Sequence, residues 1–376
     1  WLVNGKEYST EPTFSYKIDN PCRADLTCII KNKYGKVEMS TSFSSNHNFS
    51  KGFFYVADGT FNFYDTEKKT AYQDCYASLN AGKTLGIGNY DSANIIHSNG
   101  KFYLLVGTST SNRDHFYIVD AKTLYYENSA VVGANLSGLT ILNEQYGLVT
   151  GDGIRRIDLK SLNNVRIKNE RLLCFYNSII YNGKVLSNDT YKDESKVKYY
   201  DVNELIAAKE GEAPAVTELD IIQKQKINFV LAKDGNVYTL ESADNGCNIV
   251  KIKNDFTLEK VFANFQPAKG PYHSSPTIGM VASETENIIY LVSTDGAIYK
   301  YILGDSDSLK APFIAAESGV SITAPLQLNQ QSGELYVTHT EERKDESKIV
   351  VYSKDGKVLH TVDCGESVPS QILFNN

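Results

Sequence analysis

Residues 116–124 read FYIVDAKTL, and variants of this phrase recur along the chain: a run of β-forming residues, a turn residue, and a few polar residues before the next run. Close copies begin at Phe61 (FNFYDTEKK), Ile154 (IRRIDLKSL) and Val197 (VKYYDVNEL), and looser ones read IVKIKNDFTLEKV, AIYKYILGD and IVVYSKDGKVL. The turn positions recur roughly every 40–55 residues, the period expected of propeller blades, and are Asp65, Asp120, Asp158, Asp201, Asn254, Gly304 and Ser353. Because such a unit cannot bury its own faces, it must stack on its neighbours, and the repeat predicts an all-β propeller.

Groups of strands can be assigned from about Lys51 onward by the alternation of apolar and polar residues and by turn residues. The later groups each hold four predicted strands, and the sixth group ends in PFIAAE (312–317). The first group holds only three, namely Phe53–Asp58, Thr60–Asp65 and Ala71–Ala77. The chain ends in VPSQILFNN, so we expect Gln371–Phe374 to complete the first group. This pairing would close a seven-bladed ring and remove two exposed sheet edges. The one helix-like insertion is expected at Val202–Lys209.

The first 46 residues differ from the repeats. They predict short strands joined by Asn-Gly and Tyr-Gly turns, and they resemble the second half of a PKD-type immunoglobulin-like domain. The matching positions are Trp1, Asn4, Gly5, Lys6, Leu26, Ile29, Asn32 and Gly35. The family's Gly-x-Tyr before its penultimate strand is replaced by Arg23-Ala24-Asp25, and its front strands are missing. We therefore expect an incomplete PKD-like β-sandwich segment at 1–46 and a seven-bladed β-propeller at 47–376.

The repeats also resemble a family, on the segments GFFYVADGTFNFYD (52–65), LNAGKTLG (79–86) and SSPTIGMVASETENIIYLVSTDGAIYKY (274–301). These segments are similar to those of YncE-like, surface-layer-type propeller lipoproteins of the Bacteroidetes. The resemblance implies an exported protein, at the outer-membrane surface or in the periplasm, whose membrane attachment is a lipid anchor outside this sequence. It also implies a TonB-dependent outer-membrane transporter as partner, and capture of a small ligand, with corrinoids such as vitamin B12 among the candidates. The family's Asn-Glu-Gly is here Ala57-Asp58-Gly59, and no ligand-binding residue carries over by motif.

Composition narrows the functional classes. The net charge is −7 without a basic cluster, which argues against nucleic acid as a partner. No run of about 18 apolar residues is present, so no membrane span is expected. The chain holds 25 Tyr and 16 Phe, a bias typical of strands, and we expect most of these rings to pack between strands and blades.

Motifs for catalysis or metal binding are missing from the sequence. It has no GxSxG, HExxH, P-loop or CxxC pattern, and its six histidines are dispersed. We therefore expect no catalytic site, no metal and no cofactor. Quinoprotein dehydrogenases carry tryptophan-docking motifs on each blade, whereas the single Trp here lies outside the repeats. Six cysteines allow 15 disulfide connectivities, and the sequence leaves the pairing open. Cys22 and Cys28 share a short segment and are the likeliest of the possible pairs.

The ligand site is expected on one face of the ring. Loops between second and third strands, and between successive blades, converge there. The aspartates of the repeated phrase lie elsewhere and are expected to bond backbone N–H groups in turns. The predicted ligand-binding residues are Asn89, Tyr90, Asp91, Arg113, Asp114, Tyr176, Tyr191, Tyr272, His273 and Arg343. Aromatic rings mixed with cations and amides suit a planar or polar small ligand.

These observations favour a non-catalytic surface binding protein that captures a small molecule, whether a corrinoid, a haem-like molecule or a glycan, for uptake. One alternative is a protein–protein interaction scaffold on the cell surface. Another is a propeller hydrolase or lyase, which would bring two carboxylates, or a histidine and a carboxylate, together in the axial cleft.

Overall fold

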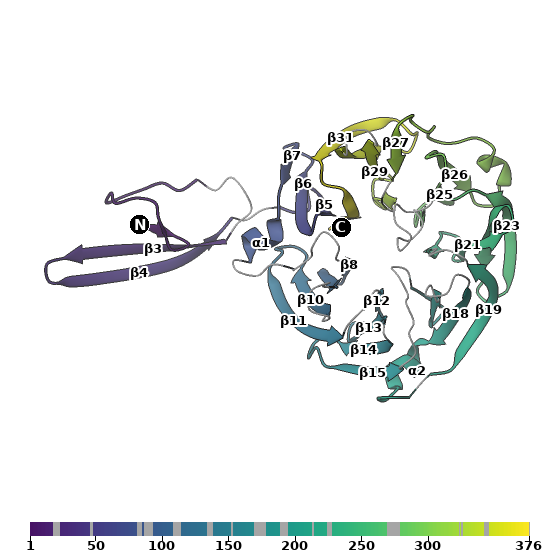
Figure 1. Ribbon diagram of the computed structural model, residues 1–376, viewed down its shortest axis with the longest axis horizontal. Coiled ribbons are helices and arrows are strands. Elements are labelled where there is room, and N and C mark those ends of the chain that lie inside the picture. Colours follow the sequence, from purple (N-terminus) through teal and green to yellow (C-terminus); the bar gives the residue numbers. More distant parts are fainter. Residues whose placement is uncertain are drawn as a thin grey trace.

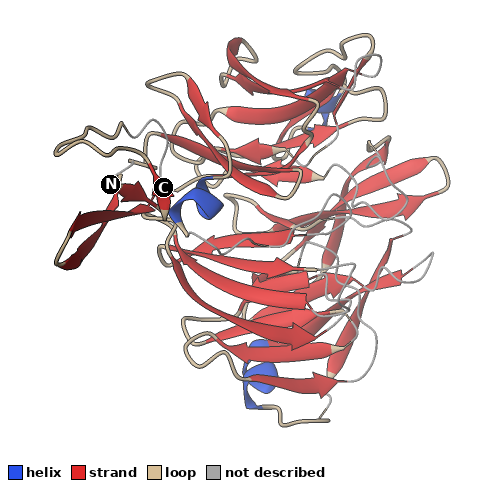
Figure 2. Cartoon of the chain, turned by 60° about the vertical axis from the view of Figure 1, so that its left-hand side comes forward, coloured by secondary structure: helices blue, strands red, loops and turns tan. Residues whose placement is uncertain are grey.

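A ring of small sheets, with an arm projecting from it, makes up the computed structural model (Figure 1). The structure describes residues 1–17, 23–45, 48–80, 85, 93–107, 114–133, 138–151, 153–168, 178–188, 195–212, 214–223, 228–268, 279–322, 324, 326–341 and 346–375. Strands dominate these residues, and the helical segments are short (Figure 2). No helix within these ranges has the length and apolar character needed to cross a membrane.

The arm is a four-stranded sheet formed by the N-terminal segment. Its order is β2-β1-β3-β4, with β1 (Leu2–Val3), β2 (Lys6–Glu7), β3 (Arg23–Asn32) and β4 (Gly35–Ser44). β3 and β4 form a long hairpin in which Cys28 pairs with Met39 and Ile30 with Val37. One face of this hairpin is therefore apolar, and it is open to solvent, since Ile30, Val37 and Met39 are each more than half exposed. The Cys28 thiol is free, so the expected Cys22–Cys28 disulfide is wrong; Cys22 itself lies outside the described residues.

Seven further sheets follow in the described part of the chain, numbered here sheet one to sheet seven around the ring. Sheet one contains β32 (Pro369–Leu373), β5 (Gly52–Ala57), β6 (Thr60–Asp65) and β7 (Thr70–Tyr72). Sheet two contains β8 (Ala93–Ser98), β9 (Lys101–Val106), β10 (Asp114–Asp120) and β11 (Tyr126–Gly133). Sheet three contains β12 (Gly138–Ile141), β13 (Tyr146–Thr150), β14 (Ile154–Asp158) and β15 (Asn164–Lys168).

Sheet four contains β16 (Ile179–Tyr181), β17 (Lys184–Asn188), β18 (Ser195–Asp201) and β19 (Val216–Gln223). Sheet five contains β20 (Val230–Leu231), β21 (Val237–Ala243), β22 (Gly246–Ile252) and β23 (Leu258–Phe265). Sheet six contains β24 (Met280–Ala282), β25 (Ile288–Val292) and β26 (Ile298–Ile302). Sheet seven contains β27 (Val320–Ile322), β28 (Gln327–Leu328), β29 (Leu335–Glu341), β30 (Glu346–Tyr352) and β31 (Val358–Gly365). The helical segments are α1 (Cys75–Leu79), α2 (Val202–Ala207) and the 3₁₀ turn η1 (Ser306–Leu309).

The C-terminal strand joins sheet one, as its sequence predicts. In β32, Gln371, Ile372 and Leu373 pair with Val56, Tyr55 and Phe54 of β5. The Gln371 side chain also donates a 2.8 Å hydrogen bond to the Ile95 carbonyl in sheet two. Ile372 is buried in a cluster shared by sheets one and seven. The two ends of the ring region are thus held together by backbone pairing and by packing.

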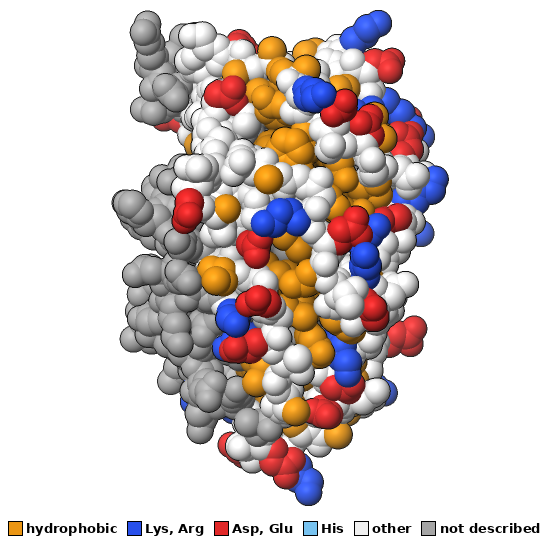
Figure 3. Space-filling model, turned by 90° about the vertical axis from the view of Figure 1, so that its right-hand side faces the viewer, with side chains coloured by type: hydrophobic (Ala, Val, Ile, Leu, Met, Phe, Trp, Pro, Cys, Tyr) orange, Lys and Arg blue, Asp and Glu red, His pale blue; other side chains and the backbone are white. Residues whose placement is uncertain are grey.

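Aromatic side chains fill the spaces between sheets. Phe54 and Phe61 of sheet one pack with Phe102 of sheet two, and Phe63 packs on Phe54, with ring centroids about 5–6 Å apart. These rings are all buried, which confirms the expectation that the aromatic residues serve strand packing. Hydrophobic side chains also reach the rim, where they form a band between charged residues (Figure 3).

The aspartates of the repeated phrase hold turns, as expected. Asp65 accepts hydrogen bonds from the N–H groups of Glu67 and Lys68, and Asp158 from those of Lys160 and Ser161. Asp120 accepts from the Thr123 N–H, and Asp201 caps α2 by accepting from Asn203 and Glu204. These turns link third and fourth strands, and we call the side of the ring that carries them the turn face. The opposite side, where second strands end and third strands begin, is the connection face.

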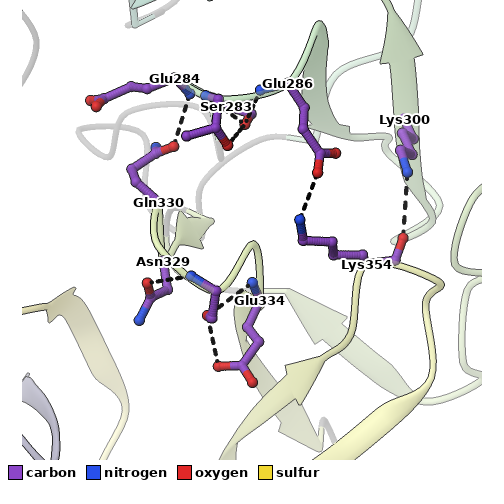
Figure 4. Close-up of polar contacts among 10 residues, drawn as sticks. Ser283, Glu284, Glu286, Lys300, Asn329, Gln330, Glu334 and Lys354 are labelled. Carbon is purple, nitrogen blue, oxygen red and sulfur yellow. Dashed lines mark hydrogen bonds and ion pairs between the residues drawn. The ribbon is translucent and has the colours of Figure 1, made fainter.

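Sheets six and seven are joined by polar contacts on the turn face (Figure 4). Lys354 pairs with Glu286 at 2.6 Å, and Lys300 donates to the Lys354 carbonyl. Gln330 accepts from the Glu284 N–H at 2.9 Å and donates to the carbonyl of Ala282 at 3.0 Å. The amide side chain therefore links the innermost strands of neighbouring sheets, as Gln371 does between sheets one and two.

Three strand or helix expectations need correction. The segment 312–317 is not a strand: its contact with β26 is the bridge between Ile298 and Ile314, and η1 precedes it. The third predicted strand of the first group ends at Tyr72, where the chain turns into α1 with Asp74 as its N-cap. The insertion at Val202–Ala207 is helical, as expected, but α1 and η1 show that it is not the only one.

Candidate ligand-binding groove

Of the predicted ligand-binding residues, Asp114 is the one that the structure describes. It is the first residue of β10, pairs with Gly133, and is buried at the connection face. The others lie outside the described residues and stay predictions: Asn89, Tyr90, Asp91, Arg113, Tyr176, Tyr191, Tyr272, His273 and Arg343.

A groove of about 300 Å³ opens between sheets five and six on the connection face. Its apolar floor consists of Phe262, Phe265, Tyr299 and Leu309. Its polar rim consists of Asn264, Gln266, Ser293, Thr294 and Asp295. The rim residues come from the end of β23 and from the turn between β25 and β26, so they belong to the side of the ring where the ligand site is expected.

The groove exists because sheet six is narrower than its neighbours. Within the described residues, β26 is its last strand, and Tyr299 on β26 points toward sheet five. There it meets Phe265 edge to face, with ring centroids 5.8 Å apart. Leu309 from η1 is buried in the same cluster and also lines the groove. A helical turn in place of a fourth strand thus leaves the aromatic side of β26 accessible.

A β-bulge shapes the rim at Asn264. Cys247 pairs with Phe265 but Ile249 pairs with Phe262, so β23 holds one extra residue at this point. Asn264 adopts a left-handed conformation with φ 61°, which asparagine tolerates better than most side chains. β31 has a bulge at its corresponding end, where Gly365 has the positive φ. The bulge is therefore part of the scaffold, whereas the amide side chain on it is particular to sheet five.

Gln266 lies close against β22. Its side-chain amide donates a 2.6 Å hydrogen bond to the Asn245 carbonyl, and its backbone carbonyl accepts from the Thr294 N–H. A Cβ at Gly246 would lie 2.4 Å from the Gln266 amide nitrogen, so glycine is required for this approach. These contacts fix the rim between the two sheets.

The rim carries one negative charge and several free polar groups. Asp295 accepts hydrogen bonds from the Ser293 hydroxyl and the Ala297 N–H, and these hold the pKa of its carboxyl below the ordinary value. It is therefore ionised at neutral pH. Among the described residues, the Asn264 amide and the Thr294 and Tyr299 hydroxyls have no hydrogen-bond partner. Such groups can bind a ligand without first breaking a contact.

A second cavity, of about 370 Å³, lies between sheets two and three on the turn face. The Lys101–Glu127 ion pair stands at its edge, and Glu144 and Lys160 add one charge of each sign. The positive and negative charges in this cavity balance one another, so the cavity favours neither an anionic nor a cationic ligand.

One histidine–carboxylate pair occurs in the described part of the chain. His339 Nδ1 lies 4.0 Å from Glu317, and its Nε2 lies 3.3 Å from the Tyr352 hydroxyl. His339 is 6% exposed, and burial lowers its pKa to about 4, with Lys348 adding to the shift. The ring packs between sheets six and seven and is not open to a substrate. Metal-binding groups of three or more His, Cys, Asp or Glu side chains are likewise missing among the described residues.

The fold and groove define a β-propeller with a candidate site on its rim, and comparisons place it in a family. Residues 49–375 match the sequence profile of DUF5074, a domain of unknown function, and the chain belongs to this family. No match was found among curated proteins.

Many solved structures are similar to the chain, among them the following two. One is a quinonprotein alcohol dehydrogenase-like protein from Bacteroides thetaiotaomicron, 99% identical, with a TM-score of 0.95 over all of this chain and 90% of that one. The other is a dihydro-heme d1 dehydrogenase, 11% identical, with a TM-score of 0.53 over 87% of this chain and 76% of that one. The second likeness shows the fold alone.

Sequence reasoning did not identify the groove residues. Phe262 and Tyr299 lie in β-runs whose alternation predicts only strand packing. The available signal was the weak apolar character of PFIAAE, which begins with proline and holds two alanines before a glutamate. That composition argues against a regular fourth strand in sheet six. Without a fourth strand, β26 becomes the outer strand of the sheet and is exposed.

Proposed function

We propose that this protein is a non-catalytic binding protein that captures a small ligand on the connection face of a seven-bladed propeller. The observation that carries the proposal is the groove between sheets five and six, where an aromatic floor meets unpartnered polar groups. Pockets with this mixture are typical of small-molecule sites. The regular aspartates are used in turns on the opposite face, which leaves the irregular segments to provide specificity.

The cellular location and the partner that we propose rest on the resemblance of the repeats to propeller lipoproteins of the Bacteroidetes. We propose an exported protein, lipid-anchored at the outer-membrane surface or periplasmic, that delivers its ligand to a TonB-dependent transporter. The ligand classes are a corrinoid, a haem-like molecule or a glycan. The N-terminal sheet is proposed to be part of a PKD-like domain, because its long β3–β4 hairpin carries the positions that resemble that family.

A quinone cofactor does not fit the residues present. The 99% identical protein is described as quinonprotein alcohol dehydrogenase-like. Quinoprotein dehydrogenases carry tryptophans on their blades, and their cofactor binds a metal. Here the single Trp is Trp1, whose indole donates to the Glu11 carbonyl and packs on Phe14 in the arm. The described residues also offer no cluster of metal ligands. We derive no redox step for this chain.

A thermal-shift screen of the purified protein tests the proposal. Cobalamin, haem and neutral oligosaccharides are each added in excess, and a bound ligand raises Tm because it stabilises only the folded state. The proposal expects a concentration-dependent rise for at least one class. No rise for any class, together with recovery of a protein partner by crosslinking in the native cell, would contradict small-ligand capture.

The second candidate is a protein-interaction scaffold, and the exposed apolar face of the arm favours it. Ile30, Val37 and Met39 are 59%, 60% and 67% exposed on one face of the hairpin. Exposed apolar patches often mark protein contacts. In this case Val37→Lys would abolish co-purification of the partner while leaving any ligand-induced Tm shift unchanged.

A further inference from the structure

We infer that the groove between sheets five and six binds the neutral ring of a sugar, through stacking on Tyr299 and Phe262 and hydrogen bonds to Asn264, Thr294 and Asp295. The inference rests on the proposed function and narrows it to one ligand class at one place. The site lies between sheets five and six on the connection face.

The floor provides a stacking surface. Tyr299 and Phe262 are partly buried and contact the core formed by sheets five and six, so their rings are held in place. Phe265 contacts Tyr299 edge to face, with ring planes at 88°. The C–H bonds on one side of a pyranose carry small positive charges, which suit the negative face of such a ring.

The rim provides both donors and acceptors. The Asn264 amide can donate and accept at once, which matches two adjacent hydroxyls of a sugar. The Thr294 and Tyr299 hydroxyls can do either, and one Asp295 oxygen has no contact among the described residues. A hydroxyl donating to an ionised carboxylate makes a stronger hydrogen bond than one donating to a neutral group.

Charge and size exclude other classes. Because Asp295 stays ionised, a phosphate or carboxylate ligand would be repelled. A corrinoid or haem is much larger than a groove of about 300 Å³, which lies at the lower end of ligand pockets, so of the three proposed ligand classes only a glycan fits the groove itself. A neutral mono- or disaccharide unit fits both constraints.

The test uses the whole chain and saturation-transfer NMR with four methyl pyranosides: glucoside, galactoside, mannoside and N-acetylglucosaminide. Asn264→Gly removes the amide and keeps the left-handed backbone, since glycine adopts it freely. Asn99→Gly is the matched control, because Asn99 is also exposed and left-handed (φ 51°) but lies on the turn face. Tyr299→Leu removes the stacking ring.

We expect transfer to at least one pyranoside from the unmodified protein and from Asn99→Gly. Asn264→Gly and Tyr299→Leu should each weaken binding about tenfold, the effect of losing one good contact. Sugar binding that both groove variants leave intact overturns the inference, although the proposed function survives. The same holds if no pyranoside binds while cobalamin or haem raises Tm. Failure of every ligand in both experiments overturns the proposed function as well.

Discussion

Tyr299 of β26 and Phe265 of β23 meet edge to face across sheets five and six, with ring centroids 5.8 Å apart and ring planes at 88°. Phe265 is 6% exposed, whereas Tyr299 is partly open to the groove. The two rings thus differ in their surroundings: Phe265 belongs to the core between the sheets, whereas Tyr299 also lines the groove proposed as the ligand site. We therefore expect substitutions of Phe265 and Tyr299 to lower the free energy of unfolding by different amounts.

Phe265→Ala should lower the free energy of unfolding by about 3–5 kcal/mol, because it removes a buried ring from the core between sheets five and six. Tyr299→Phe should change it by less than about 1 kcal/mol, since the edge-to-face contact is retained and only an unpartnered hydroxyl is lost. Urea unfolding followed by circular dichroism measures both. Equal losses would show that Tyr299 is an ordinary core residue.

Ring closure by the C-terminal strand predicts a long-range stability effect. Ile372→Ala should cost about 2–5 kcal/mol, since this side chain is buried with Phe53 and Tyr55 between sheets one and seven. The control is Leu359→Ala on the rim, where the side chain is 49% exposed and the change should cost less than about 1 kcal/mol. If the two variants unfold at the same urea concentration, β32 does not contribute to closing the ring.

The turn aspartates should matter for stability and not for binding. Burial works to raise the pKa of Asp65, but hydrogen bonds and charge from Lys68, with the Glu67 N–H, outweigh it and leave the pKa below its ordinary value. Asp65→Ala should cost about 2 kcal/mol and the more exposed Asp120→Ala about 1 kcal/mol. Ligand-induced Tm shifts should be the same in both variants as in the unmodified protein. Loss of the Tm shift in either variant would place the ligand site on the turn face.

His339 predicts a dependence of stability on pH. Its pKa is lowered from 6.5 in the unfolded chain to about 4 in the fold, chiefly by burial. The unfolded state therefore binds more protons between these values, and the contribution of His339 is complete above pH 6.5 and lost as the pH falls toward 4. The loss is on the order of 3 kcal/mol. His339→Gln should remove this part of the pH dependence in urea titrations, and an unchanged dependence would show that His339 titrates normally.

The repeat predicted the propeller architecture and the role of its aspartates because both follow from local patterns. A turn aspartate bonds N–H groups two and three residues away, and alternation reports which strand faces are buried. The groove depends on a strand pairing that does not form. Among the described residues of sheet six, no fourth strand pairs with β26, and η1 follows β26 in the chain. Whether 312–317 pairs along β26 depends on the competition between strand pairing and packing around Phe313, which a local pattern does not record.

The left-handed Asn264 illustrates the same limit. Its conformation results from the register shift between β22 and β23, which is a property of the pair of strands. Asn-Gly turns such as that at Asn99 and Gly100 can be predicted from the sequence, because the two residues that form the turn are adjacent. A lone asparagine inside a strand carries no such signal.

Hydrogen exchange measured with and without a ligand identified by the thermal-shift screen tests the central claim most directly. We expect protection of backbone N–H groups on the connection face, with segments 262–268 and 293–297 protected if the ligand occupies the groove. Exchange in the turns that hold Asp120, Asp158 and Asp201 should not change. Protection confined to those turns would contradict the claim that the regular repeats form the scaffold and the irregular segments bind the ligand.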